Sequence, residues 1–292
     1  MSKNALVRGY NSTSAFGATK KETRTKGLHS RCVRKGRISI LGAVMLTSII
    51  ITIPQCYGVI IRCNNSTMKV IPRLMKVFPT TEGSLNLIHY KLGRVPLGGK
   101  NWTEMTQQLS QLLSGYNTRQ MNYQNITECS EESPPAGHSC FFNIQLISSE
   151  CTEAKTFGYR RSEPCIFLQF PNISNWEPVP YNISDPQTVN ELPERLRSTY
   201  DPRYAYINCE GDTAFDRENL GFINYSPYQG FPVNFFPYTG QPNYMPPLVA
   251  VHFPTLRIGV AVNVVCKLWA KNVNHTEDAV PNGTVRFTLL VD

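Results

Sequence analysis

The sequence predicts a single transmembrane helix followed by an all-β domain of the immunoglobulin-like sandwich type, with one short helix and three disulfides. Three observations predict this fold. One long uncharged run near the N-terminus is long enough to cross a membrane. Seven cysteines, six of them in the predicted outer domain, and nine N-x-S/T sequons follow that run, a combination typical of extracellular domains. The chain is only 17% charged and rich in Pro, Gly, Tyr and Phe, which favours short strands and turns over a helical bundle.

The first 37 residues form a basic tail. They hold ten Lys and Arg and one acid, Glu22, for a charge of +9, whereas the whole chain has +8. The remaining chain is therefore nearly neutral. A nucleic-acid-binding domain would spread positive charge over its folded surface, so we expect no nucleic-acid partner. We interpret residues 1–37 as a cytoplasmic tail.

The uncharged run Ile38–Ile61 is the predicted membrane anchor. As a helix, its 24 residues would extend about 36 Å, and Pro54 is expected to kink it. Because Lys and Arg are in excess before the run, the N-terminus should stay in the cytoplasm, as in a type II protein of the plasma membrane that contacts membrane lipids. A cleaved signal peptide fits poorly, since the run is long and no small-residue cleavage site follows. Residues 62–80 then form a stalk and residues 81–292 an extracellular domain.

Six cysteines lie in the predicted extracellular domain: Cys129, Cys140, Cys151, Cys165, Cys209 and Cys266. They allow 15 disulfide pairings, and their spacing alone selects none. The alternative of a zinc site lacks the usual short Cys or His spacing. Cys63, at the outer edge of the anchor, could be free, in a mixed disulfide or in an intermolecular bridge. Cys32, in the tail, could be palmitoylated or an unmodified thiol.

Sequons are dense after the anchor, which predicts an N-glycosylated surface. Asn64 and Asn65 lie close to the membrane, Pro227 follows the sequon of Asn224, and Asn11 is on the cytoplasmic side, so these four should stay unmodified. The predicted glycosylation sites are Asn101, Asn125, Asn172, Asn182, Asn274 and Asn282.

One helix and five strands can be predicted from hydrophobic periodicity. Residues 103–116 have an apolar stripe at helical spacing, formed by Met105, Leu109, Leu112, Leu113 and Tyr116. Apolar residues rich in Phe, Ile, Leu and Val predict strands over 140–147, 165–170, 248–253, 261–270 and 284–291. In the fourth of these, Val262, Val264, Cys266 and Leu268 share a face, so Cys266 should point inward. In the strand predicted over 284–291, Val285, Phe287, Leu289 and Val291 share a face. Residues 171–186 and 226–247 are rich in turn residues.

Motifs for catalysis are lacking, so we expect neither an enzyme nor a cofactor, metal or small-molecule substrate. A lumenal glycosyltransferase would fit the topology, but such enzymes usually hold a divalent cation with paired carboxylates, and no Asp-x-Asp occurs. None of the histidines after the anchor has the partner at i+3 or i+4 of a zinc helix. The sequence also has no G-x-S-x-G or G-x-G-x-x-G.

Residues 222–247 are unusually aromatic and proline-rich, which we call the aromatic segment. Such rings on a stiff backbone suit a protein interface, because little entropy is lost on docking. The alternative is that they pack the domain's own core, as we expect for about half of them. The predicted partner-binding residues are Tyr225, Phe231, Pro232, Phe235, Pro237, Tyr238, Tyr244 and Pro247.

At this segment the sequence resembles the β subunits of P-type cation pumps, the family of the Na⁺/K⁺-ATPase and H⁺/K⁺-ATPase β subunits. A second similar block joins Phe157-Gly158-Tyr159 with Pro164-Cys165. The main block comprises Gly230-Phe231-Pro232, Phe235-Phe236-Pro237-Tyr238, Gly240, Tyr244, Pro247-Leu248-Val249-Ala250-Val251 and Val265-Cys266-Lys267.

The resemblance implies three sequential disulfides, Cys129–Cys140, Cys151–Cys165 and Cys209–Cys266. It also implies a non-catalytic subunit that assists folding and export of a catalytic α subunit, tunes its cation affinity and docks on it through residues 225–251. In the membrane run, the family's aromatic pattern is reduced to Tyr57-Gly58. A stand-alone type II adhesion or receptor glycoprotein is the alternative, and the sequence does not choose between a sodium and a proton pump.

Overall fold

The computed structural model describes residues 58–60, 70–80, 86–93, 102–116, 125–129, 133–276 and 282–292. All described residues belong to one compact unit, residues 54–292. Its thirteen described strands are β1 (Gly58–Ile60), β2 (Val70–Pro72), β3 (Lys76–Phe78), β4 (Leu87–Tyr90), β5 (Ile126–Thr127), β6 (Ser139–Cys140), β7 (Cys165–Gln169), β8 (Tyr204–Gly211), β9 (Asn224–Ser226), β10 (Gly230–Pro232), β11 (Leu248–His252), β12 (Val262–Trp269) and β13 (Thr284–Val291).

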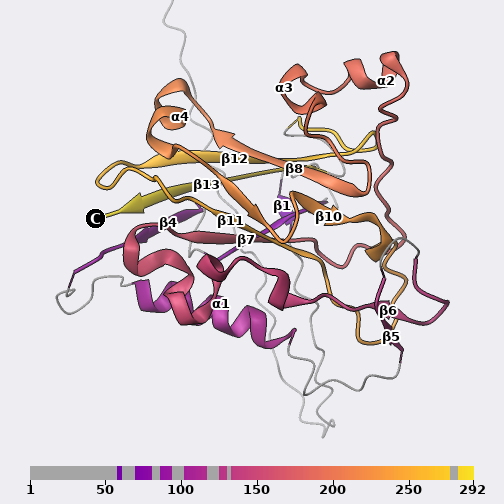
Figure 1. Ribbon diagram of the computed structural model, residues 1–292, viewed down its shortest axis with the longest axis horizontal. Coiled ribbons are helices and arrows are strands. Elements are labelled where there is room, and N and C mark those ends of the chain that lie inside the picture. The colour runs from indigo at the N-terminus through magenta and orange to yellow at the C-terminus, as the bar shows by residue number, and fades with distance from the viewer. Residues whose placement is uncertain are drawn as a thin grey trace, which may run out of the picture. The chain divides into compact units, whose positions relative to one another are not determined.

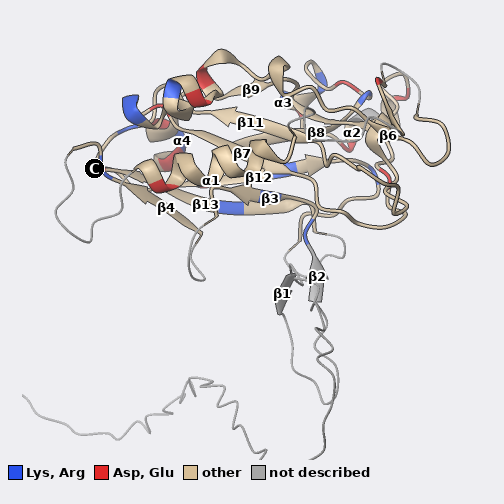
Figure 2. Cartoon of the chain, turned by 90° about the horizontal axis from the view of Figure 1, so that it is seen from below, with Lys and Arg blue, Asp and Glu red and all other residues tan. Residues whose placement is uncertain are grey.

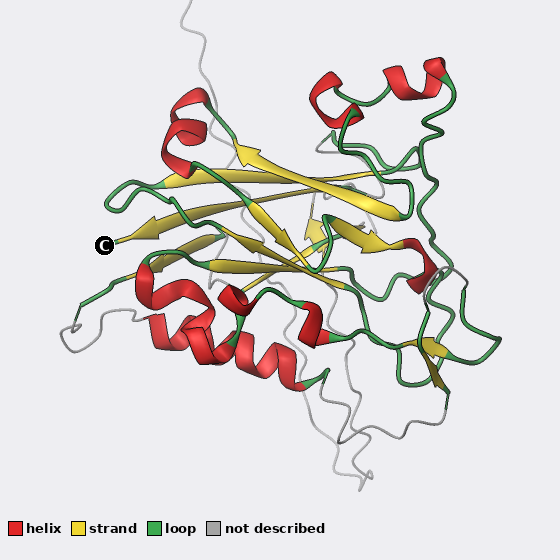
Figure 3. Cartoon of the chain, viewed as in Figure 1, coloured by secondary structure: helices red, strands yellow, loops and turns green. Residues whose placement is uncertain are grey.

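The described helices lie at the margins of the sheets, as Figure 3 shows in red. The α-helices are α1 (Trp102–Ser114), α2 (Pro186–Asn190), α3 (Glu194–Arg197) and α4 (Ala214–Leu220). The 3₁₀ segments are η2 (Ile144–Leu146), η3 (Ser149–Cys151), η4 (Glu153–Arg161) and η5 (Val233–Phe235). The helix predicted over 103–116 is confirmed as α1, which buries Met105 and Leu109.

Two sheets form the domain, as Figure 1 shows. The larger has the strand order β10-β8-β12-β13-β4, antiparallel except for the parallel pair β13 and β4. The smaller has the order β3-β7-β11-β9 and is antiparallel throughout. One buried cluster contains residues of both sheets, with ring contacts from Phe170 to Phe231 and from Phe253 to Phe287. This confirms a β-rich domain, whereas the immunoglobulin-like assignment stays a prediction.

The faces predicted to point inward in the two C-terminal strands are confirmed, although in β12 Val265 and Trp269 on the other face are buried as well. In β13, Val285, Phe287, Leu289 and Val291 are buried, while Arg286 between them is exposed. In β12, Val262, Val264, Cys266 and Leu268 are likewise buried, so the Cys266 side chain faces the core. The predicted strands over 165–170 and 248–253 correspond to β7 and β11.

A helical layer covers the outer face of the smaller sheet. The segment η4 contacts both α1 and β7 (Figure 1). Within η4, the residues Thr156, Phe157 and Gly158 have positive φ angles of 52°, 51° and 76°. A Cβ on Gly158 would lie 1.8 Å from the Glu163 carbonyl oxygen, so glycine is required there. This turn directs Phe157 onto Phe167 and Tyr159 onto Tyr90, and both residues of the turn are fully buried.

The strand predicted over 140–147 is wrong. Strand β6 ends at Cys140, and the 3₁₀ turn η2 follows within that range. The Asn143 side chain accepts a hydrogen bond from the Gln145 N–H at 2.9 Å. Asparagine side chains that bond the nearby backbone in this way favour turns over strands.

The predicted boundaries need two corrections. Strand β3 lies within the proposed stalk 62–80 but pairs with β7, so the domain begins before residue 81. Gly58–Ile60, at the end of the predicted anchor 38–61, form β1, which pairs with β2. The rest of that anchor, the tail 1–37, Cys63 and Asn101 lie outside the described residues. Among the helices that the structure describes, none is both long enough and apolar enough to span a membrane.

Charged side chains are mixed over the domain in the view of Figure 2, where blue and red residues lie mainly on helices and loops. Several form local ion pairs, such as Arg195 with Glu210 and Arg161 with Glu150 and Glu163. The sheet strands are nearly uncharged in this view, in keeping with their burial.

Candidate partner-binding surface

Three disulfides hold the scaffold of the domain: Cys129–Cys140, Cys151–Cys165 and Cys209–Cys266. They are the three pairs that the family resemblance implies. The first closes the loop between the paired strands β5 and β6, and the second joins η3 to β7. The third joins β8 to β12 inside the larger sheet.

Part of the aromatic segment belongs to the core. Phe231 is fully buried, and Phe235 and Phe236 are 6% and 4% exposed. The Phe236 ring lies 4.6 Å from the ring of Phe170, which directly follows β7. Pro247, just before β11, is also buried. The burial of Phe231 and Pro247 argues against their contact with a partner, because the domain itself encloses their side chains, and their partner-binding role stays a prediction.

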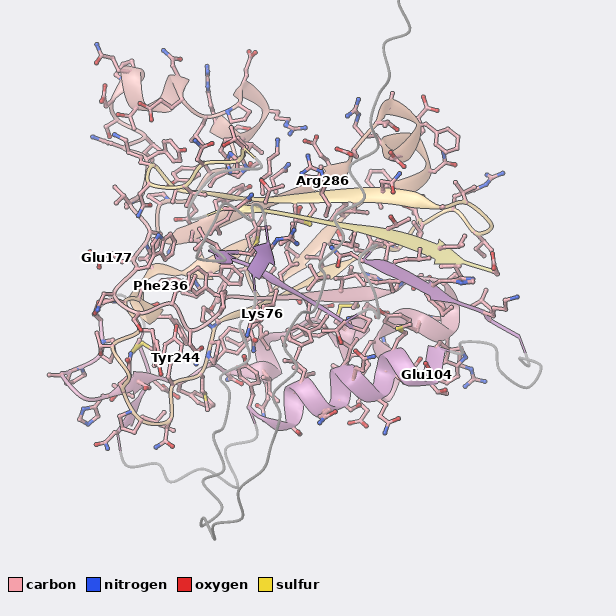
Figure 4. The ribbon with its side chains drawn as sticks, turned by 180° about the vertical axis from the view of Figure 1, so that it is seen from behind. Lys76, Glu104, Glu177, Phe236, Tyr244 and Arg286 are labelled. Atoms are coloured by element: carbon pink, nitrogen blue, oxygen red, sulfur yellow. A yellow bond between two sulfur atoms is a disulfide. The ribbon has the colours of Figure 1, made fainter. Side chains whose placement is uncertain are left out.

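The other predicted residues of this segment are half-buried and keep some surface. They are Tyr225, Pro232, Pro237, Tyr238 and Tyr244. The rings of Tyr238 and Tyr244 pack at 4.8 Å. From the side shown in Figure 4, Phe236 and Tyr244 lie toward one end of the domain and Glu104 of α1 toward the other. Tyr238 and Tyr244 thus remain candidates for a docking surface.

Tyr225 has a structural role as well. Its hydroxyl accepts a hydrogen bond from the Cys209 N–H at 2.8 Å. Burial raises the pKa of this hydroxyl, so it stays protonated at neutral pH. Its ring packs against the hydrophobic core, which leaves little of it for a partner.

A cleft of about 560 Å³ opens beside the buried part of the aromatic segment. It forms where the ends of β5, β6, β8 and β10 meet η5, and we call it the aromatic cleft. Its walls are built by Glu128, Cys129, Phe141, Phe142, Asn143, Leu146, Arg203, Tyr204, Pro227, Tyr228, Pro232, Val233, Asn234 and Phe235. Two of the predicted partner-binding residues, Pro232 and Phe235, thus line a concave surface.

Stacked tyrosines form one wall of the cleft. The rings of Tyr204 and Tyr228 lie 4.9 Å apart at 27°, and Tyr228 is 38% exposed. The Arg203 guanidinium lies 5.8 Å from the Tyr204 ring centre and donates hydrogen bonds to both carboxylate oxygens of Asp201. These bonds lower the pKa of Asp201. A second hollow of about 680 Å³ shares Cys129, Arg203, Tyr204 and Tyr228 with the cleft.

Sequence reasoning missed Arg203, Tyr204 and Glu128 as surface candidates. Tyr228 lies inside the aromatic segment, which is the signal that could have singled it out. No comparable signal exists for Glu128 and Tyr204, because they reach the cleft from distant parts of the chain. Within the described ranges, no group of three or more His, Cys, Asp or Glu is arranged to hold a metal ion.

The predicted glycosylation sites differ in their surroundings. Asn125, Asn172, Asn182 and Asn274 are exposed. Asn282 is half-buried, its Nδ2 donates to the Thr276 carbonyl at 3.1 Å, and its Oδ1 accepts from the Thr284 N–H at 2.7 Å. The structure therefore favours the four exposed sites over Asn282.

Comparison with known proteins reveals clear similarity over most of the chain. The family model described as "Sodium / potassium ATPase beta chain" matches residues 64–287. Sodium/potassium-transporting ATPase subunit beta-2 of Drosophila melanogaster is 34% identical over 231 residues, covering 73% of this chain and 68% of the relative. Subunit beta-1 of the same organism is 33% identical, over 52% of this chain and 50% of the relative.

A third relative comes from a nematode. The probable sodium/potassium-transporting ATPase subunit beta-3 of Caenorhabditis briggsae is 30% identical over 66% of this chain and 58% of the relative. The matched regions thus span between half and about two thirds of these relatives.

Proposed function

Because this chain belongs to the sodium/potassium ATPase beta chain family, we propose that it is the non-catalytic β subunit of a P-type sodium/potassium-transporting ATPase. The match of the family model over residues 64–287 carries the proposal. In this role the chain assists the folding and export of a catalytic α subunit and tunes its cation affinity, while the α subunit holds the ATP and ion sites. The chain itself binds no cofactor and turns over no substrate.

Purification from native membranes tests this proposal. The tagged full-length chain is expected to bring down a P-type ATPase α subunit in comparable molar amount, identified by mass spectrometry. An unrelated type II membrane glycoprotein with the same tag serves as control. If the chain emerges without such an α subunit, the proposal is wrong, and the stand-alone adhesion or receptor glycoprotein becomes the better interpretation.

We further propose a type II topology in the plasma membrane. Even with Gly58–Ile60 assigned to β1, the preceding residues 38–57 provide 20 uncharged residues, about 30 Å as a helix. The basic tail 1–37 then remains in the cytoplasm and the disulfide-bonded domain lies outside. Protease added to intact cells should digest the domain and spare an epitope in the tail. Digestion of the tail epitope instead would contradict the topology.

The docking site for the α subunit is proposed to be the accessible part of the aromatic segment together with the aromatic cleft. Pro232, Pro237, Tyr238 and Tyr244 retain surface there. Large aromatic side chains at an interface contribute much of its binding free energy. Replacing Tyr238 by alanine should lower recovery of the α subunit, whereas Phe215→Ala, at a 59% exposed position on α4 outside both the aromatic segment and the cleft lining, should not. Equal recovery with both variants would exclude Tyr238 from the interface.

A further inference from the structure

One buried side chain of the aromatic cleft has an unused hydrogen-bond acceptor. Asn234 is 7% exposed and lines the cleft. Its Nδ2 donates to the Cys129 carbonyl at 2.9 Å, which orients the amide. Its Oδ1 is buried and accepts no hydrogen bond within the part of the chain that the structure describes. Because buried acceptors without a donor are unfavourable, such a group points to a donor supplied from outside the chain.

The charge of the cleft favours a cation as that donor. Glu128 is exposed in the cleft wall, and no described residue forms an ion pair with it. The basic residue in the lining is Arg203, and Asp201 already neutralises it through both carboxylate oxygens. The cleft therefore presents a carboxylate and an amide oxygen without a matching positive charge.

The apolar walls suit the stem of a long basic side chain. Tyr228 exposes part of its ring, and Phe141 is half-buried beside it in the lining. A cation near an aromatic face is attracted by the ring quadrupole, and the methylene groups of Lys or Arg pack well on apolar surface. Leu146, 54% exposed, adds such a surface. A volume of about 560 Å³ is ample for one such side chain.

We propose that the aromatic cleft receives a lysine or arginine side chain from an extracellular loop of the catalytic α subunit, with Glu128 and Asn234 as acceptors and Tyr228 against its stem. This inference rests on the proposed function, since it names the chemistry by which the partner is recognised. An acidic side chain would be repelled by Glu128, and a purely apolar one would leave Asn234 Oδ1 unpaired. Pro232 and Phe235 connect the cleft to the proposed docking segment.

Two variants of the full-length chain test the cleft, each with a matched control. Glu128→Gln removes the charge and keeps the shape, and Glu218→Gln removes an equally exposed carboxylate on α4. Tyr228→Ala removes the aromatic wall, and Phe215→Ala removes an exposed ring on α4, outside the aromatic segment. The apparent dissociation constant of the purified complex with the α subunit is measured by dilution at low and high salt, and thermal unfolding midpoints check that each variant is folded.

Glu128→Gln should raise the dissociation constant about threefold at low salt and reduce its salt dependence, because an exposed ion pair is weak and screened. Tyr228→Ala should raise it about tenfold. If the wild-type chain binds the α subunit but Glu128→Gln behaves like Glu218→Gln, the cleft inference is overturned while the proposed function stands. If the wild-type chain binds no α subunit, both are overturned.

Discussion

Cys209 and Cys266 lie directly opposite each other on the neighbouring strands β8 and β12, with Cα atoms 4.0 Å apart and joined by a disulfide. Both side chains are buried, at 4% and 0% exposure. The bond therefore ties together two adjacent strands of the larger sheet and closes a loop with a sequence separation of 57 residues. Within that loop lie the aromatic segment and the strands β9, β10 and β11.

Replacing Cys209 and Cys266 together by alanine should lower the free energy of unfolding by about 4 kcal/mol, because a long loop gains much entropy when its closure is released. The same change at Cys129 and Cys140, with a sequence separation of 11, should cost about 3 kcal/mol. Urea unfolding of the two double variants measures both values. A larger loss for the short loop would contradict this ranking.

Phe231→Ala should destabilise the domain by about 3–5 kcal/mol, because it removes a fully buried ring and leaves a cavity. Phe222→Ala, at a position 76% exposed, should change the unfolding free energy by less than about 0.5 kcal/mol. Urea unfolding measures the free energy of unfolding of both variants. A stable Phe231→Ala variant that fails to bind a partner would show that this ring is part of the interface after all.

Asp216→Asn should weaken the N-terminal cap of α4. The Asp216 Oδ2 accepts from the N–H and the hydroxyl of Thr213, and its Oδ1 accepts from the Asn263 N–H at 2.8 Å. Burial acts to raise the pKa of Asp216, but these hydrogen bonds outweigh it and lower the pKa. The Asp216→Asn variant should therefore have a free energy of unfolding about 1–2 kcal/mol lower than the wild type at pH 7.

The effect of Asp216→Asn should depend on pH in a defined direction. A carboxylate with a lowered pKa in the folded state contributes its full stability above the unfolded value of about 3.9, and this contribution is lost as pH falls through the folded pKa. The difference in the free energy of unfolding between wild type and variant should therefore be constant from pH 7 to about 5 and shrink below about pH 4. Urea unfolding across this range measures it, and a difference that grows on acidification would refute the role of the ionised carboxylate.

Asn282→Gln should leave the number of glycans on the extracellular domain unchanged. The Asn282 Nδ2 donates to the Thr276 carbonyl, and Thr284 of the same sequon is 5% exposed, so a sugar on that nitrogen would compete with a contact of the folded domain. Asn172→Gln, at an exposed position, should instead remove one glycan. Gel mobility before and after glycosidase treatment compares the variants. A mobility shift with Asn282→Gln would contradict the assignment.

Strand β8 shows why part of the fold escaped prediction. Its outward-facing Tyr206 is 2% exposed, because a second buried cluster of Tyr181, Leu192, Leu196, Tyr200 and Trp269 covers that end of the sheet. Apolar and polar residues therefore do not alternate cleanly along β8. In β13, by contrast, Arg286 and Thr288 face outward and keep the alternation intact. Alternation detects a strand where one face meets solvent. Strands β7 and β11 are buried on both faces and were predicted instead from continuous apolar runs, which the mixed sequence of β8 lacks.

The sequence by itself determined the features that depend on neighbouring residues: helix α1, the strands β7, β11, β12 and β13, and the inward direction of Cys266. Periodicity is local, so it can be read without knowing the fold. Only the tertiary structure decided which rings of the aromatic segment are core, because Phe236 is enclosed by Phe170 and Trp176 from a distant part of the chain. The sequence could not predict the aromatic cleft either, since its walls join residues 128–129, 141–143, 146, 203–204, 227–228 and 232–235.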